Sequence, residues 1–299
     1  SAVSNRHGDF ASSARADAIV EGARAAVGDL LGADSRGVFF GPSMTANTYV
    51  LARTLGATWQ PGDEVVVSRL DHDADVRPWV QAAERSGATV RWAEFDEKTC
   101  ELPIEQYDEL LTDRTKLVAV TAASNAVGTM PDVRAIADLV HAAGALLHVD
   151  GVHATPHGTV DVSALGADFY SCSAYKWYGP HVGITVADPA LLETLRPDKL
   201  VPSSDDVPDR FEFGTPAFEQ LAGERDVGQI GFRIATDEIK NSVRARVGDA
   251  GPTVDGDHGA QLAAEVEEPA LAHERHRRRP LGVVDVAQGA ELRSGGHSD

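Results

Sequence analysis

Residues 146–153 read LLHVDGVH, a short apolar run that ends in an acid followed by a glycine. This pattern is typical of a buried β-strand that leads into a turn. Ligands of open α/β sheets bind at the carboxyl ends of the strands, so we expect Asp150 at such a binding edge. Taken alone, the pattern also allows Asp150 to be a helix cap or a structural ion-pair partner.

Residues 168–180 read DFYSCSAYKWYGP and place a single lysine, Lys176, directly after a second apolar strand pattern. Aromatic residues stand on both sides of it. Lysines are normally solvated, and burial among aromatic rings depresses the pKa of the amine unless it is paired or used covalently. We therefore expect Lys176 to be enclosed by these rings and to be functional.

Outward from these two stretches, short β-branched runs alternate with longer segments of helical period, which indicates parallel strands joined by crossover helices. The expected class is α/β, with one mostly parallel seven-stranded sheet. Strands are expected at Val38–Phe40, Glu64–Ser68, Thr89–Ala93, Leu117–Val120, Leu146–Asp150, Phe169–Ser171 and Val182–Val186. Helices are expected over residues 13–31, ended by Gly32, and at Met44–Leu55, Ala74–Ser86, Ile104–Leu111 and Val133–Ala143.

The composition excludes several partners. A formal net charge of -19 over 299 residues repels phosphate backbones and anionic lipids, so neither nucleic acid nor membrane is expected as a partner. The first twenty residues contain no apolar signal core, and no apolar run approaches the roughly 18 residues of a membrane span, so a cytoplasmic protein is expected. The two cysteines, Cys100 and Cys172, lack metal-site spacing and are expected to be plain thiols.

The last quarter of the chain differs from the rest. Beyond about Gly223 it shows neither a period of 2 nor one of 3.6, and it is rich in glycine, histidine and charged residues. We expect residues 1–223 to form one large domain and residues 224–299 to be a divergent or poorly ordered C-terminal region.

Six stretches occur in the order and at the approximate spacing of one known family. They read FFGPSMTANT from residue 39, PGDEVVVSRLDHDADVRPW from 61, TAASNAVGTMPDV from 121, HVDGVHATPH from 148, SCSAYKWYGPHVGI from 171 and RFEFGTP from 210. The sequence resembles the class V aminotransferase superfamily of fold-type I pyridoxal-phosphate (PLP) enzymes, and within it the cysteine desulfurase-like proteins. The resemblance implies the large domain of that fold, with helices on both faces of the sheet, and pyridoxal 5'-phosphate as the cofactor.

Three residues take catalytic roles by this resemblance. Lys176 corresponds to the lysine that forms a Schiff base with the cofactor aldehyde. Asp150 corresponds to the acid beside the pyridine nitrogen, where its charge keeps that nitrogen protonated and the ring electron-poor. His72 corresponds to the imidazole stacked on the cofactor ring, with a solvated loop histidine as the alternative.

Further residues correspond to cofactor-binding positions. Asn125 and His153 match groups that bond the phenolic oxygen, although Asn125 could instead hold a turn. A phosphate site is implied at Ser43-Met44-Thr45, where a helix begins after a strand and a turn, and Ser43 alone could be a helix cap.

Ser173 and Tyr175 complete the implied phosphate pocket. Thr215 matches a residue that reaches the phosphate of a partner subunit, which implies a homodimer with composite active sites. An ordinary Gly-Thr-Pro turn is the alternative for Thr215.

The resemblance also has gaps. Cysteine desulfurases use a cysteine well after the lysine, and none follows Cys172 here, so persulfide chemistry is not expected. Neither the N-terminal segment of complete relatives nor their small domain, with its carboxylate-binding arginine, is recognisable. We expect residues 1–223 to be the large domain of a longer enzyme whose tail arose by truncation or a change of reading frame.

Three functional hypotheses follow from the sequence. The first is a PLP enzyme acting on a small amino acid, and the second is a weak or inactive truncated cofactor-binding dimer. A minor alternative is a metal-binding α/β protein that uses His148, Asp150 and His153, with His157 nearby.

Overall fold

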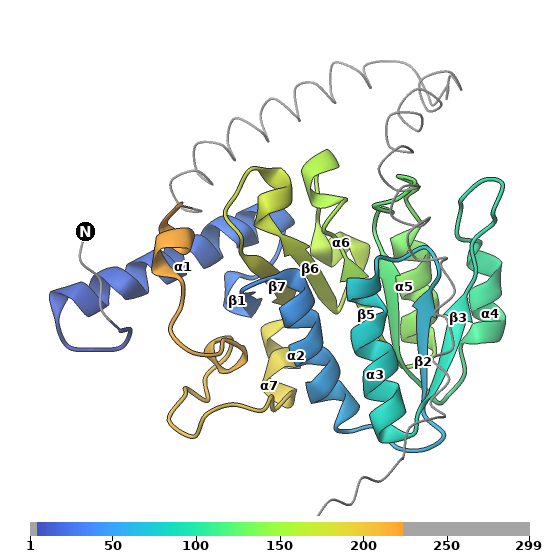
Figure 1. The fold of residues 1–299 in the computed structure, drawn as a ribbon, viewed down its shortest axis with the longest axis horizontal. Coiled ribbons are helices and arrows are strands. Elements are labelled where there is room, and N and C mark those ends of the chain that lie inside the picture. The colour runs from blue at the N-terminus through green and yellow to red at the C-terminus, as the bar shows by residue number, and fades with distance from the viewer. Residues whose placement is uncertain (1–4, 224–299) are drawn as a thin grey trace, which may run out of the picture. The chain divides into compact units, whose positions relative to one another are not determined.

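A seven-stranded sheet lies at the centre of residues 5–223, the part of the chain that the computed structural model describes (Figure 1). The strands are β1 (Val38–Gly41), β2 (Glu64–Ser68), β3 (Thr89–Ala93), β4 (Thr115–Thr121), β5 (Leu146–Asp150), β6 (Phe169–Ser173) and β7 (Gly183–Ala187). They are arranged in the order β1-β7-β6-β5-β4-β2-β3. All seven overlap the strands expected from the sequence.

The sheet is mostly parallel, as predicted. Only β7 runs against its neighbours, β1 and β6, while β6, β5, β4, β2 and β3 are paired in parallel. The register aligns Thr121 with Asp150, and Asp150 with Ser171. Asp150 is the last residue of β5 and lies between Thr121, the last residue of β4, and Ser171, two residues before the end of β6. Because parallel strands end at a common edge, this is the expected position for a ligand site.

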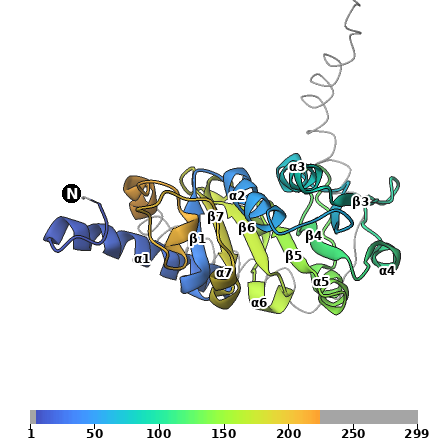
Figure 2. The same ribbon diagram turned by 90° about the horizontal axis from the view of Figure 1, so that it is seen from below.

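Helices cover both faces of the sheet (Figure 2). They are α1 (Ala11–Leu31), α2 (Met44–Gly56), α3 (Arg77–Ser86), α4 (Tyr107–Leu110), α5 (Val133–Ala142), α6 (Val162–Leu165) and α7 (Pro189–Thr194). Helices α2, α3 and α7 pack on one face, and α1, α5 and α6 pack on the other. Alternation along the strands supplies both layers: Val65 and Val67 face the first set of helices, and Val66 faces the second.

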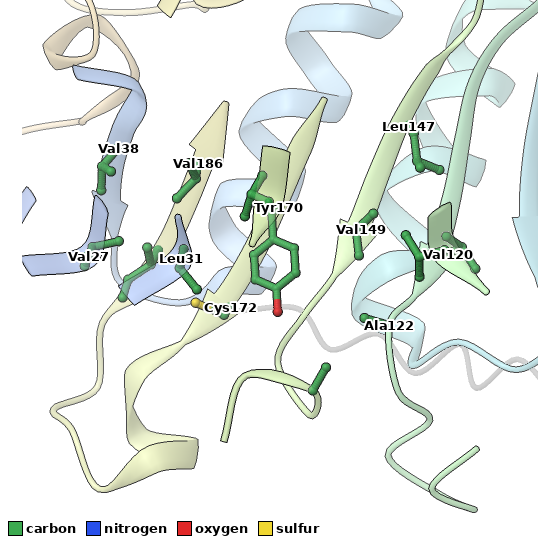
Figure 3. Close-up of a cluster of buried hydrophobic side chains, with 14 of the residues drawn as sticks. Val27, Leu31, Val38, Val120, Ala122, Leu147, Val149, Tyr170, Cys172 and Val186 are labelled. Carbon is green, nitrogen blue, oxygen red and sulfur yellow. The ribbon is translucent and has the colours of Figure 1, made fainter. Parts of the chain in front are cut away.

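The core between the sheet and helices α1 and α5 is drawn in Figure 3. Leu31 of α1 packs there with Val186, and Leu147 and Val149 extend the same layer. Cys172 lies in this layer with no exposed surface, as a plain core residue. Burial of this kind contributes roughly 1.5–3 kcal/mol for each large aliphatic side chain.

Two helices differ from the sequence expectation. The helix expected over Ala74–Ser86 begins only at Arg77, after a short 3-10 turn, η2 (Asp73–Asp75). Pro78 explains the delay, because proline lacks the N–H that a residue beyond the first helical turn must donate. The helix expected over Ile104–Leu111 is likewise divided into a 3-10 turn, η3 (Ile104–Gln106), and α4.

A buried ion network holds α1 against the segment that follows the sheet. Arg24 of α1, which is 3% exposed, lies 2.6 Å from Asp209 and 2.9 Å from Glu212. Arg6 lies 2.7 Å from the same Asp209 oxygen. Glu212 also accepts a hydrogen bond from the backbone N–H of Phe40, so the network satisfies a donor of the edge strand β1.

Within residues 5–223, none of the helices combines the length and the apolar character that a bilayer span requires.

Candidate functional site

A cavity of about 140 Å³ opens at the carboxyl edge of the parallel strands. Its lining comes from segments far apart in the sequence: the start of α2, the loop after β2, and the ends of β4, β5 and β6. The residues that line it are Met44, Thr45, His72, Ala74, Thr121, Ala123, Asn125, Asp150, Val152, His153, Ser173, Tyr175 and Lys176. All the site residues expected from the sequence are among them except Ser43 and Thr215.

Lys176 enters the cavity from η5 (Ala174–Trp177), the 3-10 turn that follows β6. The expectation that aromatic rings enclose it is wrong, because its side chain is exposed. Trp177 packs against the core and donates its indole N–H to the Ser173 carbonyl, while Tyr178 is 97% exposed. Among the aromatic residues of the described part of the chain, Tyr175 is the one whose ring approaches the Lys176 amine, at 5.2 Å. In this tight turn successive side chains point in different directions, so residues that are neighbours in the sequence do not surround Lys176 in space.

Asp150 ends β5 and is 4% exposed. One carboxylate oxygen, Oδ1, accepts a hydrogen bond of 2.8 Å from the backbone N–H of Val152, and no described residue donates to Oδ2. Burial raises the pKa of Asp150, and the Val152 N–H, His148 and His72 oppose that rise. A buried carboxylate with one oxygen lacking a donor is suited to a cationic or N–H-bearing partner in the cavity.

His72 is both exposed and part of the cavity wall. Its Nδ1 accepts a hydrogen bond of 3.1 Å from the backbone N–H of Ala74, which caps the turn η2. That bond fixes the ring at the cavity mouth and leaves Nε2 as the nitrogen available to carry the proton.

The start of α2 forms the other end of the cavity. Ser43 is the N-cap, with its hydroxyl accepting from the Ala46 N–H, so the cap interpretation of Ser43 describes what its side chain does. Met44 donates its backbone N–H to the Ser173 hydroxyl at 3.4 Å. A Cβ on Gly183 would lie 2.0 Å from the Ser43 carbonyl carbon, so only glycine lets β7 approach the helix start this closely.

Asn125 lines the cavity from the loop after β4 but does not hold the loop together. That role falls to Ser124, whose hydroxyl accepts from the N–H groups of Ala126 and Val127. On the opposite wall, the rings of His153 and His157 meet edge to face at 4.9 Å. Burial, followed by the charges of His157 and Lys176, lowers the pKa of His153.

Two further residues that the sequence suggested as site residues do not line the cavity. Thr215 is exposed in the loop around Gly214 and does not line the cavity. His148 is fully buried, lies 2.7 Å from Asp75, and is likewise absent from the cavity wall. Among residues 5–223 no group of three histidine, cysteine or acidic side chains is placed to hold a metal ion, so the metal alternative finds no site there.

Four further residues line the cavity that the sequence did not predict as site residues: Ala74, Thr121, Ala123 and Val152. Thr121 could have been found, because it is the last residue of β4 and pairs in register with Asp150. The rule that ligands bind at strand ends predicts such a neighbour once the strand order is known.

The fold and this cavity define an α/β protein with a candidate site at the carboxyl ends of its parallel strands. Residues 2–245 match the family model described as aminotransferase class-V, so the chain belongs to that family. The match extends beyond the last of the six sequence stretches, which ends at Pro216.

The relatives include characterised and uncharacterised proteins. An uncharacterized protein of Mycobacterium tuberculosis, MT3887, is 38% identical over 79% of this chain and 59% of its own. A cysteine desulfurase of Dickeya dadantii is 38% identical over 62% of this chain and 45% of its own. The apo structure of a cysteine desulfurase from Thermococcus onnurineus superposes with a TM-score of 0.72 at 26% identity, covering 78% of this chain and 62% of that one. The chain thus spans about half the length of the curated relatives it matches.

Class V aminotransferases and cysteine desulfurases are PLP-dependent, so PLP is the cofactor of the family to which the chain belongs. The cavity fits this group on three counts. It holds one lysine amine, a buried carboxylate that lacks a donor at Oδ2, and a helix start whose first N–H groups suit an anion. The close approach that Gly183 permits keeps that helix start against the sheet.

Proposed function

We propose that the chain binds PLP in this cavity, with Lys176 as the residue that bonds the cofactor, and that it acts on a small amino acid. The observation that carries the proposal is the convergence of Lys176, Asp150, His72 and the start of α2 on one cavity from four separate segments. Family membership supports the choice of cofactor. The substrate and the reaction are proposals because the chain spans only part of its relatives.

Bound PLP supplies an electron sink for a bond broken at the substrate Cα. Asp150 would hold a proton on the pyridine nitrogen through its Oδ2, since Oδ1 is already occupied by Val152. Lys176 would bond the cofactor aldehyde, and its amine, once displaced by substrate, would take and return the Cα proton. Its exposed position on the turn after β6 leaves the amine accessible for both tasks.

The phosphate would bind at the start of α2. The backbone N–H groups of the first turn and the positive end of the helix dipole attract an anion there. Ser173, which already accepts from the Met44 N–H, would orient that amide, and Thr45 adds a hydroxyl at the same wall.

Persulfide transfer is not the reaction we propose for this chain. Cys172 has no exposed surface, and neither it nor Cys100 lines the cavity. Aminotransfer, racemisation or β-elimination need no thiol and are the reactions that the cavity residues support.

The test is a PLP titration of the full chain followed by near-visible absorption, in parallel with Lys176→Ala and with Lys98→Ala as an exposed control lysine. We expect a saturable absorption band in the wild type and the control, and its loss in Lys176→Ala. Borohydride reduction followed by peptide mass spectrometry should find the cofactor on the peptide containing Lys176. Equal absence of the band from all three proteins, or label on another lysine, would refute the proposal.

A second candidate is a cofactor-binding dimer with little catalysis. The composition of the cavity wall favours this candidate. Among the described residues that line the cavity, Lys176 is the only lysine or arginine. The described wall therefore offers no guanidinium to bind a substrate carboxylate. A panel of amino acids added to the PLP-loaded protein separates the two candidates, because turnover shifts the absorption band and releases keto acid, alanine or an inverted stereocentre. Light scattering tests the dimer, and in a dimer Thr215→Ala should weaken PLP binding.

A further inference from the structure

A line of buried polar side chains runs beneath the cavity, between the sheet and helices α2 and α3. Asp75 Oδ1 lies 2.7 Å from His148 Nδ1, and His148 Nε2 lies 3.0 Å from the Ser171 hydroxyl. Ser171 in turn bonds the Thr185 hydroxyl at 2.9 Å, and Thr185 accepts from the Asn47 amide at 3.2 Å. These five residues are called the buried polar chain below.

Each member of the buried polar chain stands next to the cavity along the sequence. Asp75 is three residues after His72, and His148 is two residues before Asp150. Ser171 is two residues before Ser173, and Asn47 is three residues after Met44. Thr185 is two residues after Gly183, and Gly183 lies close to the start of α2. The buried polar chain therefore connects the five segments that carry or support the cofactor-binding groups.

Burial makes these contacts demanding. All five side chains are at most 3% exposed, and apolar residues such as Trp79 and Phe169 pack in the same layer. A buried polar group without a hydrogen-bond partner destabilises the fold, so the buried polar chain holds its shape only while each of its contacts is made. An apolar layer would have been a simpler way to pack these strands.

The charges around the Asp75–His148 pair are crowded. Asp71 hydrogen-bonds Asp75, and both carboxyls feel the charge of Asp150 on β5. Burial, reinforced by these like charges, raises the pKa of Asp71 and of Asp75 well above the usual range. Burial lowers the pKa of His148 to about 4.

The other groups that face this cluster are neutral or exposed. Trp79 of α3 donates its indole N–H to Asp75, and Ser68 donates its hydroxyl to Asp71. Tyr107 adjoins Asp71, and burial keeps the pKa of its phenol above the usual range. His72 is exposed, and its charge opposes the rise in the pKa of Asp150. No lysine or arginine among the described residues pairs with these carboxyls.

We propose that the buried polar chain is a positioning network for the cofactor cavity, in which Asp75 is a neutral acid whose hydroxyl donates a hydrogen bond to Nδ1 of a neutral His148. His148 then donates Nε2–H to Ser171, whose hydroxyl donates to Thr185. Each of the four contacts then joins one donor to one acceptor, and no member of the buried polar chain carries a charge. Asp150 becomes the one carboxylate of the cluster free to ionise against the cofactor, a step that rests on the proposed PLP function.

The protonation state is tested first, in protein without added cofactor. Long-range proton–nitrogen spectra of ¹⁵N-histidine-labelled full chain, with the His148 signal assigned from His148→Gln, should show the Nε2–H tautomer unchanged from pH 6 to pH 8. A Nδ1–H tautomer would mean an ionised Asp75 and would overturn the proposal, as would an imidazolium. Because no cofactor is present, this result is independent of whether the chain binds PLP.

The positioning role is tested with matched variants. Asp75→Asn keeps a neutral donor to His148 and should leave the PLP dissociation constant within about twofold of wild type. Asp75→Leu and His148→Leu break the chain and should weaken PLP binding about tenfold or more, while His148→Gln, which can accept and donate, should restore most of the loss. Leu192→Ala, a change in the core on the same sheet face at a residue that does not line the cavity, should lower stability without changing PLP affinity.

The outcomes separate the two proposals. If the wild type takes up no PLP, the proposed function fails while the tautomer result still stands or falls by itself. If Asp75→Asn weakens PLP binding as much as Asp75→Leu, a charged Asp75 is required and the network proposal is overturned. If Leu192→Ala weakens PLP binding as much as His148→Leu does, the buried polar chain affects PLP affinity only through the stability of the fold, and the positioning role is wrong.

Discussion

The Asp75 carboxyl lies 2.7 Å from the imidazole Nδ1 of His148, and neither side chain has any exposed surface. Asp75 follows β2 and His148 lies within β5, which are separated in the sheet by β4. This contact joins the loop that carries His72 to the strand that carries Asp150. It has a direct consequence for how stability depends on pH.

Asp75→Asn should stabilise the protein without cofactor at neutral and mildly alkaline pH. Burial raises the pKa of Asp75 in the folded state, so its contribution to stability is complete below its unfolded pKa of about 4 and is lost as the pH rises toward the folded value. Asparagine does not titrate, so the advantage of the variant should grow by up to about 1.4 kcal/mol per pH unit above that point. Urea unfolding from pH 4 to pH 8 measures this.

Asp113→Asn, at an exposed position, is the control and should run parallel to wild type at every pH. A stability difference between Asp75→Asn and wild type that stays constant or falls as the pH rises would contradict the raised pKa.

Arg24→Met should destabilise the fold by about 3 kcal/mol, because it leaves Asp209 and Glu212 without their shared buried cation. Burial already raises the pKa of Glu212, and Arg24 is the main group that opposes this. The loss should therefore be smaller at low pH, where Glu212 takes up a proton. Denaturant unfolding at pH 5 and pH 8 measures it.

Arg36→Met removes the exposed pair with Asp34 and serves as the control, with little expected change in stability. Equal losses in the two variants would show that burial of the Arg24 network has no energetic importance.

Gly183→Ala should prevent the close approach of β7 to the start of α2. The new Cβ would lie 2.0 Å from the Ser43 carbonyl carbon and 2.4 Å from the Met44 nitrogen, both of them backbone atoms that cannot rotate away. We expect a stability loss of roughly 2 kcal/mol and a marked loss of PLP affinity. Gly158→Ala, where a Cβ meets nothing within 4 Å, should change neither property.

Ser173→Ala and Ser43→Ala should separate binding from helix capping. Ser173 lines the cavity and accepts from the Met44 N–H, so its loss should weaken PLP binding about tenfold. Ser43 only caps α2, so its loss should cost about 1 kcal/mol of stability with a smaller effect on affinity. Paired thermal melts and PLP titrations measure both, and the reverse ranking of affinities would show that the Ser43 hydroxyl itself binds the phosphate.

Most elements of the fold were predictable because they depend on local patterns. The run before Asp150 is mostly apolar, with leucine or valine on both faces of β5, which is typical of a strand buried in a parallel sheet. Two predictions failed because they depended on the local path of the backbone: where the helix after His72 begins, and which way the side chains around Lys176 point. Pro78 delayed the helix after His72, and the turn after β6 turned Trp177 to the core while leaving Lys176 exposed.

The sequence by itself determined the α/β class, the approximate positions of the strands, and the presence of Asp150 and Lys176 at or after strand ends. Alternation along a strand and the period of a helix are encoded within a few residues, so they can be read without knowing the partners. The tertiary structure alone decided that Asp75 meets His148 and that Asn47 reaches Thr185. Those contacts depend on strand order, cross-strand register and helix packing, which are set by residues far apart along the chain.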